Sequence, residues 1–265
     1  MTRPTIEDLV THMKKHKDAV IIIGDKIAPE IGKTMEPVID GEESEQEKVF
    51  TRKALVKETN KFWDYYFRDI YYTDHSVPDV YNTIYKFKQL ELAKFIISTD
   101  IRHQPTGISD LDLRGVSTII KCNRCDSAME ASYMEESFIE EEMIGKNNYK
   151  CPTCNNRLRP DCLLYGENYY PNKIKEMTRA IFKEEEGKEV TPNTHTLILI
   201  GVDMQEDLIA EMYDNYLLVR ERIEEPCYIV MITDKEEEVR LFTPEFATAV
   251  DIEAATTRLI GYFND

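Results

Sequence analysis

Two pairs of cysteines carry the most readable chemistry in this chain. The first pair lies in CNRC at 122–125 and the second in CPTC at 151–154, with 25 residues between them. Each CxxC places two sulfurs on one side of a tight turn, and two such turns form the tetrahedral four-sulfur cage that zinc prefers. A redox pair or free thiols is the alternative that a single CxxC would leave open. Two pairs favour structural zinc, held by Cys122, Cys125, Cys151 and Cys154.

A zinc ion in such a cage would hold structure and would not catalyse, because four thiolates leave no position for water. The acidic segment between the two pairs predicts a hairpin or a short helix. Cys162 and Cys227 lie in apolar stretches, which predicts that both are core residues.

The net charge limits the partners that this chain can bind. Its 265 residues carry a formal charge of −17, which argues against nucleic acids and anionic membranes because both are anionic. No apolar run approaches the roughly 18 residues of a membrane span. The N-terminus also lacks the basic-then-apolar profile of a signal peptide. We therefore expect a cytoplasmic protein with reduced thiols, for which a basic peptide remains a possible partner.

Short apolar segments alternate with amphipathic ones along the chain. Thr5 and Asp8 form a capping-box pair in front of a helix with apolar residues at 6, 9, 10 and 13. Continuous apolar runs separated by helices indicate an α/β fold with a Rossmann-like, doubly wound parallel sheet covered on both faces. The predicted strands are AVIII (19–23), KFIIS (94–98), TLILIG (196–201) and CYIVMI (227–232).

Two smaller units interrupt the predicted sheet. The aromatic-rich segment at 50–72 looks helical, and a packed helical subdomain is a better explanation for it than an aromatic ligand site. We predict a helical module at 36–76 and a zinc-ribbon module at 121–157. The large Rossmann-like domain then comprises 1–35, 77–120 and 158–265, and both modules lie above the carboxyl ends of its strands.

The segment LRPDCLLYGENYYP (158–171) resembles the sirtuins, the family of NAD-dependent protein-lysine deacylases. The family reads LRP-D-x-V-x-F-G-E there. This chain matches that pattern directly at six positions, with Tyr165 in place of the Phe, and the matching residues are Leu158, Arg159, Pro160, Asp161, Gly166 and Glu167. Three further segments resemble the family in the same order, namely LDLRGVSTIIKCNRC (111–125), TLILIGVDMQ (196–205) and IVMITD (229–234). The resemblance implies a sirtuin-like fold with an inserted zinc ribbon and helical module, and NAD as cofactor.

The resemblance also implies a peptide cleft. In sirtuins the segment that matches CLLYGEN forms one wall of a cleft in which an extended peptide pairs as an added strand. The candidate substrate-binding residues are therefore Leu163, Tyr165, Gly166 and Glu167. Retention of this segment for packing alone is the competing interpretation.

The cofactor loop departs from the family pattern G-A-G-I-S. In VIIIGDKIAPEIG (20–32), Lys26 replaces the second glycine and Ala28 replaces the serine. Glycines let backbone N–H groups approach a pyrophosphate, whereas the Asp25 carboxylate would repel it. A contact from Lys26 to a phosphate would offset that loss. Gly24 and Gly201 remain as candidate cofactor-binding residues.

The catalytic segments depart as well. The histidine of the family's L-H-G segment is Arg114 here, and a guanidinium cannot accept a proton. The family's T-Q-N-I-D becomes STDIR, with Asp100 and Arg102 in place of Asn and Asp. His103 is the possible substitute base, although a lone histidine in a polar loop is more often a surface residue. The family's GTS loop becomes Gly201-Val202-Asp203, which places a further carboxylate near the expected adenosine.

Two functions follow from these departures. Because several of them converge on the cofactor, the sequence favours a divergent sirtuin-like protein, catalytically impaired or inactive, which acts as a binding or regulatory module. The alternative is an active NAD-dependent deacylase or ADP-ribosyltransferase with rearranged residues. A third interpretation is a different small ligand at the sheet's switch point. We expect structural zinc, impaired NAD binding, and a peptide or protein partner.

Overall fold

The computed structural model describes residues 4–27, 48–71, 79–101, 108–134, 149–204, 206–242, 244–249 and 251–263. Its largest element is a six-stranded sheet in which all neighbouring strands are parallel. In spatial order the strands are β11 (Phe246–Ala249), β10 (Tyr228–Thr233), β9 (Thr196–Ile200), β1 (Ala19–Ile23), β2 (Ala93–Ser98) and β3 (Leu111–Asp112). The predicted parallel sheet is confirmed, and all four predicted strands begin and end within one residue of the predicted bounds.

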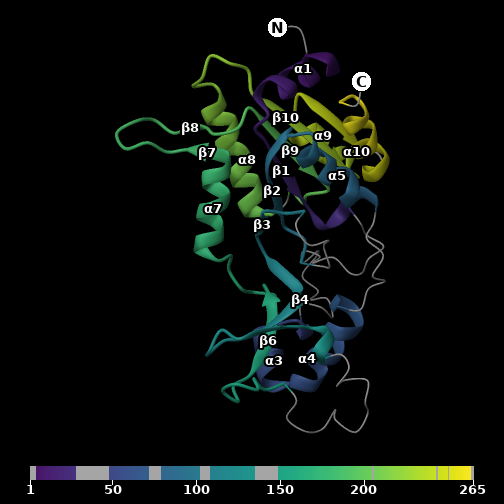
Figure 1. Ribbon diagram of the computed structural model, residues 1–265, viewed down its shortest axis with the longest axis vertical. Coiled ribbons are helices and arrows are strands. Elements are labelled where there is room, and N and C mark those ends of the chain that lie inside the picture. Colours follow the sequence, from purple (N-terminus) through teal and green to yellow (C-terminus); the bar gives the residue numbers. More distant parts are fainter. Residues whose placement is uncertain are drawn as a thin grey trace.

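Helices cover both faces of this sheet, as predicted (Figure 1). Side chains of β1 alternate between two cores, with Ile21 and Ile23 in one and Val20 and Ile22 in the other. The first core is completed by α1 (Ile6–His16), α5 (Asp79–Gln89) and α10 (Ile252–Gly261). The second is completed mainly by α7 (Pro171–Ile181) and α8 (Asp207–Arg220), and α9 (Glu236–Phe242) packs beside β10 and β11.

The strand order reverses direction between β1 and β9. From β1 the chain continues to β2 on one side, and from β9 it continues to β10 on the other. The segments that follow these two strands, η1 (Asp25–Ile27) and residues 201–204, therefore meet at the topological switch point. In open α/β sheets this crevice at the carboxyl ends of the strands is where ligands bind.

A smaller module lies beyond the carboxyl ends of the parallel strands (Figure 1). Its antiparallel sheet has the order β5 (Ala128–Glu130), β4 (Gly115–Cys122), β6 (Leu158–Cys162). The helices α3 (Arg52–Lys57) and α4 (Thr59–Tyr65) and the π-helical turn η3 (Tyr66–Tyr71) pack on it. Phe62, Trp63 and Tyr66 are fully buried, so the aromatic segment packs as core, as predicted. The domain boundaries themselves stay a prediction.

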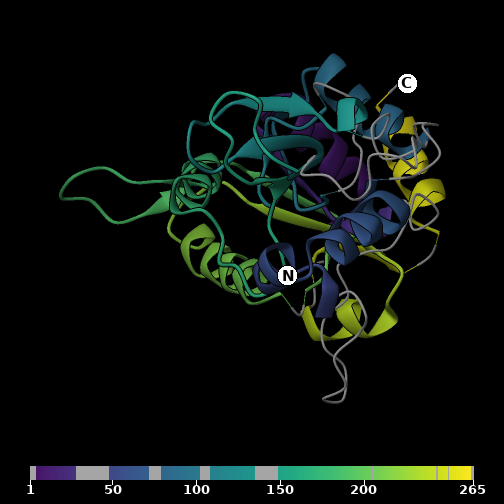
Figure 2. The same ribbon diagram turned by 90° about the horizontal axis from the view of Figure 1, so that it is seen from below.

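The capping box that the sequence predicts at the start of α1 is confirmed. Thr5 Oγ1 accepts a hydrogen bond from Asp8 N, and Asp8 returns one to the Thr5 backbone, so the capping box forms. The acidic stretch 183–189 lies in the hairpin of β7 (Phe182–Lys183) and β8 (Thr191–Pro192), which projects from the body in both views (Figure 2). Within the described ranges, no helix combines the length and the apolar character that crossing a membrane requires.

Some sequence predictions fall outside the described residues. These are most of the acidic segment between the cysteine pairs, and Ala28, Arg102 and His103.

Candidate functional site

Gly24 and Gly201 pack against each other where the two switch-point segments cross. A Cβ added to Gly24 would lie 2.1 Å from the Gly201 carbonyl oxygen. Gly201 adopts a φ of +59°, and a Cβ there would lie 2.8 Å from Ile27 N. The close approach of two backbones accounts for both glycines without a ligand, because no side chain fits between them.

Two N–H groups of the segment after β1 are used within the protein. Gly24 N donates to Ile200 O at 2.9 Å, and Lys26 N donates to Gly201 O at 3.2 Å. A phosphate-binding loop needs N–H groups that point toward the ligand. Neither of these two N–H groups is therefore available to a phosphate in this arrangement.

The Lys26 side chain is directed at two carboxylates. Its Nζ lies 3.6 Å from Glu238 Oε1 and 3.8 Å from Asp203 Oδ1. Lys235 Nζ lies 3.8 and 4.0 Å from the same two oxygens, and Glu238 also accepts a hydrogen bond from Thr233. Two lysines thus balance the two carboxylates. The charge of Asp203, which the sequence predicts near the adenosine of NAD, is therefore already paired.

Arg114 lies in the turn between β3 and β4, and two side chains from other segments bind its guanidinium. Its Nε donates to the Tyr169 hydroxyl at 2.9 Å, and its Nη2 donates to Glu206 Oε2 at 2.6 Å. The side chains of Arg114 and Glu206 are only 15% and 13% exposed. A paired guanidinium with no acceptor therefore stands where the family motif has its histidine.

Glu206, the N-cap of α8, is a cleft residue that the sequence reasoning missed. Burial raises the pKa of its carboxyl group, the charge of Asp25 adds to that effect, and Arg114 only partly offsets it. Its Oε1 is buried without a hydrogen-bond partner among the described residues. The available signal was its place at the start of the helix that follows a switch-point strand.

Asp100 is buried beside the end of β2. It is 1% exposed, and its Oδ2 accepts a hydrogen bond from the Tyr81 hydroxyl at 3.1 Å. Its backbone N–H donates to Ser98 Oγ at 3.1 Å. This carboxylate is therefore part of an internal hydrogen-bond network that reaches α5.

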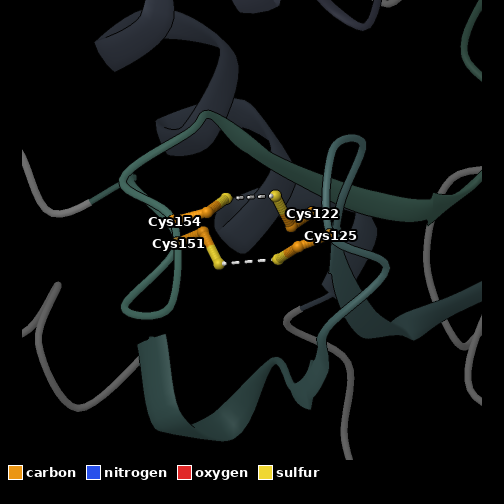
Figure 3. A group of neighbouring side chains, drawn as sticks. All are labelled: Cys122, Cys125, Cys151 and Cys154. Carbon is orange, nitrogen blue, oxygen red and sulfur yellow. Dashed lines mark hydrogen bonds between the residues drawn. The ribbon is translucent and has the colours of Figure 1, made fainter.

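The four cysteines converge from two loops of the smaller module (Figure 3). Cys122 and Cys154 have sulfurs 3.4 Å apart, and Cys125 and Cys151 have sulfurs 3.5 Å apart. All four sulfurs lie within 4.8 Å of one another. Zn–S bonds of about 2.3 Å at tetrahedral angles put sulfurs about 3.8 Å apart, so this cluster fits one zinc ion.

Ser127 lies beside this cysteine cluster. Its Oγ is 2.8 Å from Cys125 Sγ and 3.2 Å from Cys151 Sγ. The hydrogen bond with Ser127 is the main reason that the pKa of the Cys151 thiol falls to about 5, and it also lowers the pKa of Cys125. Thiolate character at these sulfurs favours metal binding, because the thiolate is the form that ligates.

Arg159 and Glu167 are joined by two parallel hydrogen bonds of 2.7 and 2.6 Å. Arg159 also donates to the Pro160 and Cys162 carbonyls, and Glu167 accepts from Leu164 N at 3.0 Å. These bonds close the loop after β6 on itself. The LRP-D and G-E elements of the sequence motif thus have partners within the chain.

The other predicted substrate residues also make internal backbone bonds. Leu163 N donates to Arg114 O at 2.8 Å, and Tyr165 N donates to Phe50 O at 2.9 Å. Gly166 has a φ of +78°, and there is open space where a Cβ would lie. The glycine is therefore explained by its left-handed backbone conformation and not by a close contact. Leu163 is buried, whereas Tyr165 and Glu167 are partly exposed.

Comparison with known proteins identifies the family to which this chain is related. The model described as "Sir2 family" matches residues 38–201. An NAD-dependent protein deacylase of Thermococcus sibiricus is 30% identical over 125 residues, which are 46% of this chain and 48% of that protein. An NAD-dependent protein deacetylase of Caldivirga maquilingensis is 27% identical over 124 residues, 45% of either chain. The chain thus matches about half the length of these two relatives.

A third relative matches over a longer stretch. An NAD-dependent protein deacylase of Pyrococcus abyssi is 24% identical over 194 residues, 70% of this chain and 74% of that protein.

Solved structures share the fold along nearly the whole chain. One from a study of sirtuin substrate affinity has a TM-score of 0.75 at 16% identity and covers 98% of this chain and 99% of its own. A Sir2–p53 peptide–NAD+ complex has a TM-score of 0.72 at 15% identity, with the same two coverages. The predicted sirtuin-like fold, with its four-cysteine cluster, is confirmed. The matched family model spans more than half of the residues, and the chain belongs to the Sir2 family.

Proposed function

We propose that this sirtuin-family chain is impaired in deacylation and acts as a binding or regulatory module. The observation that carries the proposal is the ion pair between Arg114 and Glu206. In sirtuins the histidine of the corresponding motif deprotonates a ribose hydroxyl, which Arg114 cannot do because its guanidinium stays protonated. The loss of a general base lowers a rate by roughly 10²–10⁴-fold.

A second defect concerns the cofactor. Two backbone N–H groups after β1 bond to the neighbouring loop, and the carboxylates of Asp25 and Glu206 interact electrostatically in the same cleft. A pyrophosphate brings two more negative charges, which like charges in a poorly solvated site repel strongly. These residues therefore do not fit the NAD pyrophosphate, and we propose that NAD binding is weak.

The competing function is an active NAD-dependent deacylase or ADP-ribosyltransferase. It is favoured by the relatives, which are named NAD-dependent protein deacylases and a deacetylase. A buried carboxyl group with a raised pKa is also the kind of group that can serve as a general base near neutral pH. In that case Glu206, rather than His103, is the first candidate for the base.

One experiment separates these functions. The full chain is incubated with NAD and an acetyl-lysine peptide, and deacetylated peptide and nicotinamide are followed by mass spectrometry beside an active sirtuin. We expect no turnover from the unmodified protein and none from Arg114→His, because the cofactor defect remains. Robust nicotinamide release by the unmodified protein would overturn the proposal, and its loss in Glu206→Gln would then assign the base.

Thermal shift measurements test the cofactor step alone. A ligand at about 100-fold over its dissociation constant stabilises a protein by about 2.7 kcal/mol. We expect no shift with NAD, ADP-ribose or nicotinamide at millimolar concentration. A clear shift with NAD would show that the charged cleft accepts the cofactor and that only the missing base limits turnover.

Structural zinc is proposed at the four cysteines, in about one equivalent per chain. The short sulfur–sulfur distances, with all four sulfurs within 4.8 Å of one another, support it. Cys151→Ser should lower the zinc content and destabilise the module. Equal stability of metal-free and metal-loaded protein would contradict this proposal.

A peptide or protein partner is proposed for the wall formed by Leu163, Tyr165, Gly166 and Glu167. A solved relative is a complex with a p53 peptide, and the charge of −17 favours a basic partner. A peptide array should show binding that Tyr165→Ala weakens, and an array without Tyr165-dependent binding would leave only the packing role. The absence of nucleic-acid and membrane partners and the cytoplasmic location stay predictions.

A further inference from the structure

A cluster of histidines and carboxylates lies at the amino ends of the parallel strands, on the opposite side of the sheet from the switch-point cleft at their carboxyl ends. Asp18 directly precedes β1, His195 directly precedes β9, and Glu225 lies three residues before β10. These three strands are neighbours and parallel, so their amino ends meet at one edge. The last turn of α1 adds His16 at the same edge, at the end of the molecule farthest from the smaller module (Figure 1).

Three of these side chains bring ligand atoms together. His16 Nε2 is 3.1 Å and His195 Nε2 is 3.7 Å from Glu225 Oε2. The two imidazole rings stack with centroids 4.0 Å apart and planes 28° from parallel. Among the described residues, only this group and the four cysteines place three or more potential metal ligands within 4.8 Å of one another.

His195 is oriented by a carboxylate behind it. Its Nδ1 lies 2.7 Å from Asp18 Oδ2, and its backbone N–H donates to the same carboxylate at 3.2 Å. Metal-ligating histidines commonly have a carboxylate on the other ring nitrogen, which sets the tautomer and leaves the free nitrogen basic. Here that arrangement leaves Nε2 facing His16 and Glu225.

The third imidazole of the cluster is buried. His12 lies one helical turn before His16, is 7% exposed, and has its ring centroid 4.3 Å from that of His16. Its Nε2 has no hydrogen-bond partner among the described residues. A buried polar atom without a partner is uncommon in folded proteins.

We propose that His16, His195 and Glu225 bind a divalent transition-metal ion, with Asp18 as a positioning residue. Two imidazoles and one carboxylate suit zinc, nickel and cobalt, and they leave further positions for water. Lys15 Nζ lies 3.1 Å from Glu225 Oε1, so its charge competes with the ion. This site is therefore weaker than the four-cysteine cluster and fills after it.

The test uses the full-length chain loaded with zinc at the cysteines and then titrated with Ni²⁺ by isothermal calorimetry. We expect one additional equivalent of nickel, with zinc retained at the cysteines. Glu225→Gln should abolish nickel binding or weaken it more than tenfold. Glu224→Gln is the matched control, because it removes a neighbouring exposed carboxylate that is not part of the ligand cluster, and it should leave binding unchanged.

A second set of variants tests the positioning residue and one of the imidazole ligands. Asp18→Asn should weaken nickel binding roughly 10–100-fold, the usual effect of losing a carboxylate behind a ligating histidine. His16→Gln should remove a ligand, and unchanged thermal melting with full zinc content would show that both variants are folded. An unmodified chain that takes up no nickel would overturn the proposal. So would nickel binding that persists in both Glu225→Gln and His16→Gln.

Discussion

The ion pairs Arg159–Glu167 and Arg114–Glu206 join the same two residue types, but their surroundings differ. In the loop after β6, Glu167 accepts two bonds from Arg159 and one from Leu164 N. In the cleft, Glu206 accepts one bond from Arg114, and its second oxygen is buried without a partner. The loop pair is satisfied on both sides, whereas the cleft pair leaves a buried carboxylate only half satisfied.

The pKa values of the two carboxyl groups follow from this difference. Burial tends to raise both pKa values, but the hydrogen bonds from Arg159 and Leu164 hold the pKa of Glu167 below its usual value. At Glu206 burial wins, and the pKa is raised. A satisfied pair stabilises the fold, while an incompletely satisfied one in a cleft is more often retained for a function. We therefore expect the loop pair to serve the fold and the cleft pair to serve the function of the site.

The first prediction has the largest expected effect. Removal of the proposed zinc should affect the region around the loop pair and not the region around the cleft pair. Structural zinc contributes apparent binding free energies of about 10–16 kcal/mol in zinc-finger peptides. Chelation should therefore greatly increase amide hydrogen exchange in β4 and β6, which carry the loop pair. Amides in β9 and α8, next to the cleft pair, should keep their protection. Equal loss of protection in both regions would show that they unfold together.

The second prediction breaks the loop pair. Arg159→Ala leaves the Glu167 carboxylate buried without its main partner, so the free energy of unfolding should fall by about 3–5 kcal/mol. Urea denaturation measures this change. Arg240→Ala is the control, because Arg240 pairs with Glu236 on the surface at 77% exposure, and its loss should change stability by less than about 0.5 kcal/mol.

The third prediction breaks the cleft pair and expects a smaller effect. Arg114→Ala should lower the free energy of unfolding by about 1–2 kcal/mol, because Glu206 can take up a proton once its partner is gone. The double replacement Arg114→Met with Glu206→Leu should recover most of the loss. The matching double replacement of Arg159 and Glu167 should not, because it leaves backbone groups without partners. A larger loss at Arg114 than at Arg159 would contradict the comparison.

The fourth prediction is a pair of opposite pH dependences, with the smallest expected effect. The lowered pKa of Glu167 adds stability above pH 4.5, which is lost as the pH falls through the folded-state value. The raised pKa of Glu206 adds stability below pH 4.5, which is lost as the pH rises through the folded-state value. Relative to the unmodified chain, Glu206→Gln should gain stability on going from pH 4.5 to 7. Glu167→Gln should lose stability as the pH rises from about 3 to 5. Denaturation curves at each pH measure both slopes, and slopes of the same sign would refute the assignment.

The sequence predicted elements whose signals are local. A buried parallel strand such as β1 is a continuous apolar run, so its position is readable from five consecutive residues. The four cysteines are readable for a related reason, because each CxxC fixes its own turn and only one further contact joins the two turns. The sequence order of the motifs then indicated the family, which the match over residues 38–201 confirms.

Other parts of the site depend on contacts between distant segments. Gly24 looks like a cofactor residue in sequence, yet its space is filled by Gly201, which lies 177 residues later. Lys26 looked like an obstruction to a phosphate, and it pairs with Asp203 and Glu238 instead. No local pattern announces such pairs, because ion pairs depend on distance in space and not on spacing in the chain.

Sequence alone determined the four central strands of the parallel sheet, the set of four clustered cysteines and the arginine at position 114, because each depends on residue identity and short-range spacing. The tertiary structure decided how Arg114 is held at that position, namely by an ion pair with Glu206. It also decided that His16, His195 and Glu225, spread over 210 residues, meet at one sheet edge. The physical reason is that parallel strands bring their starts together at one edge and their ends at the other, whatever their separation in the chain.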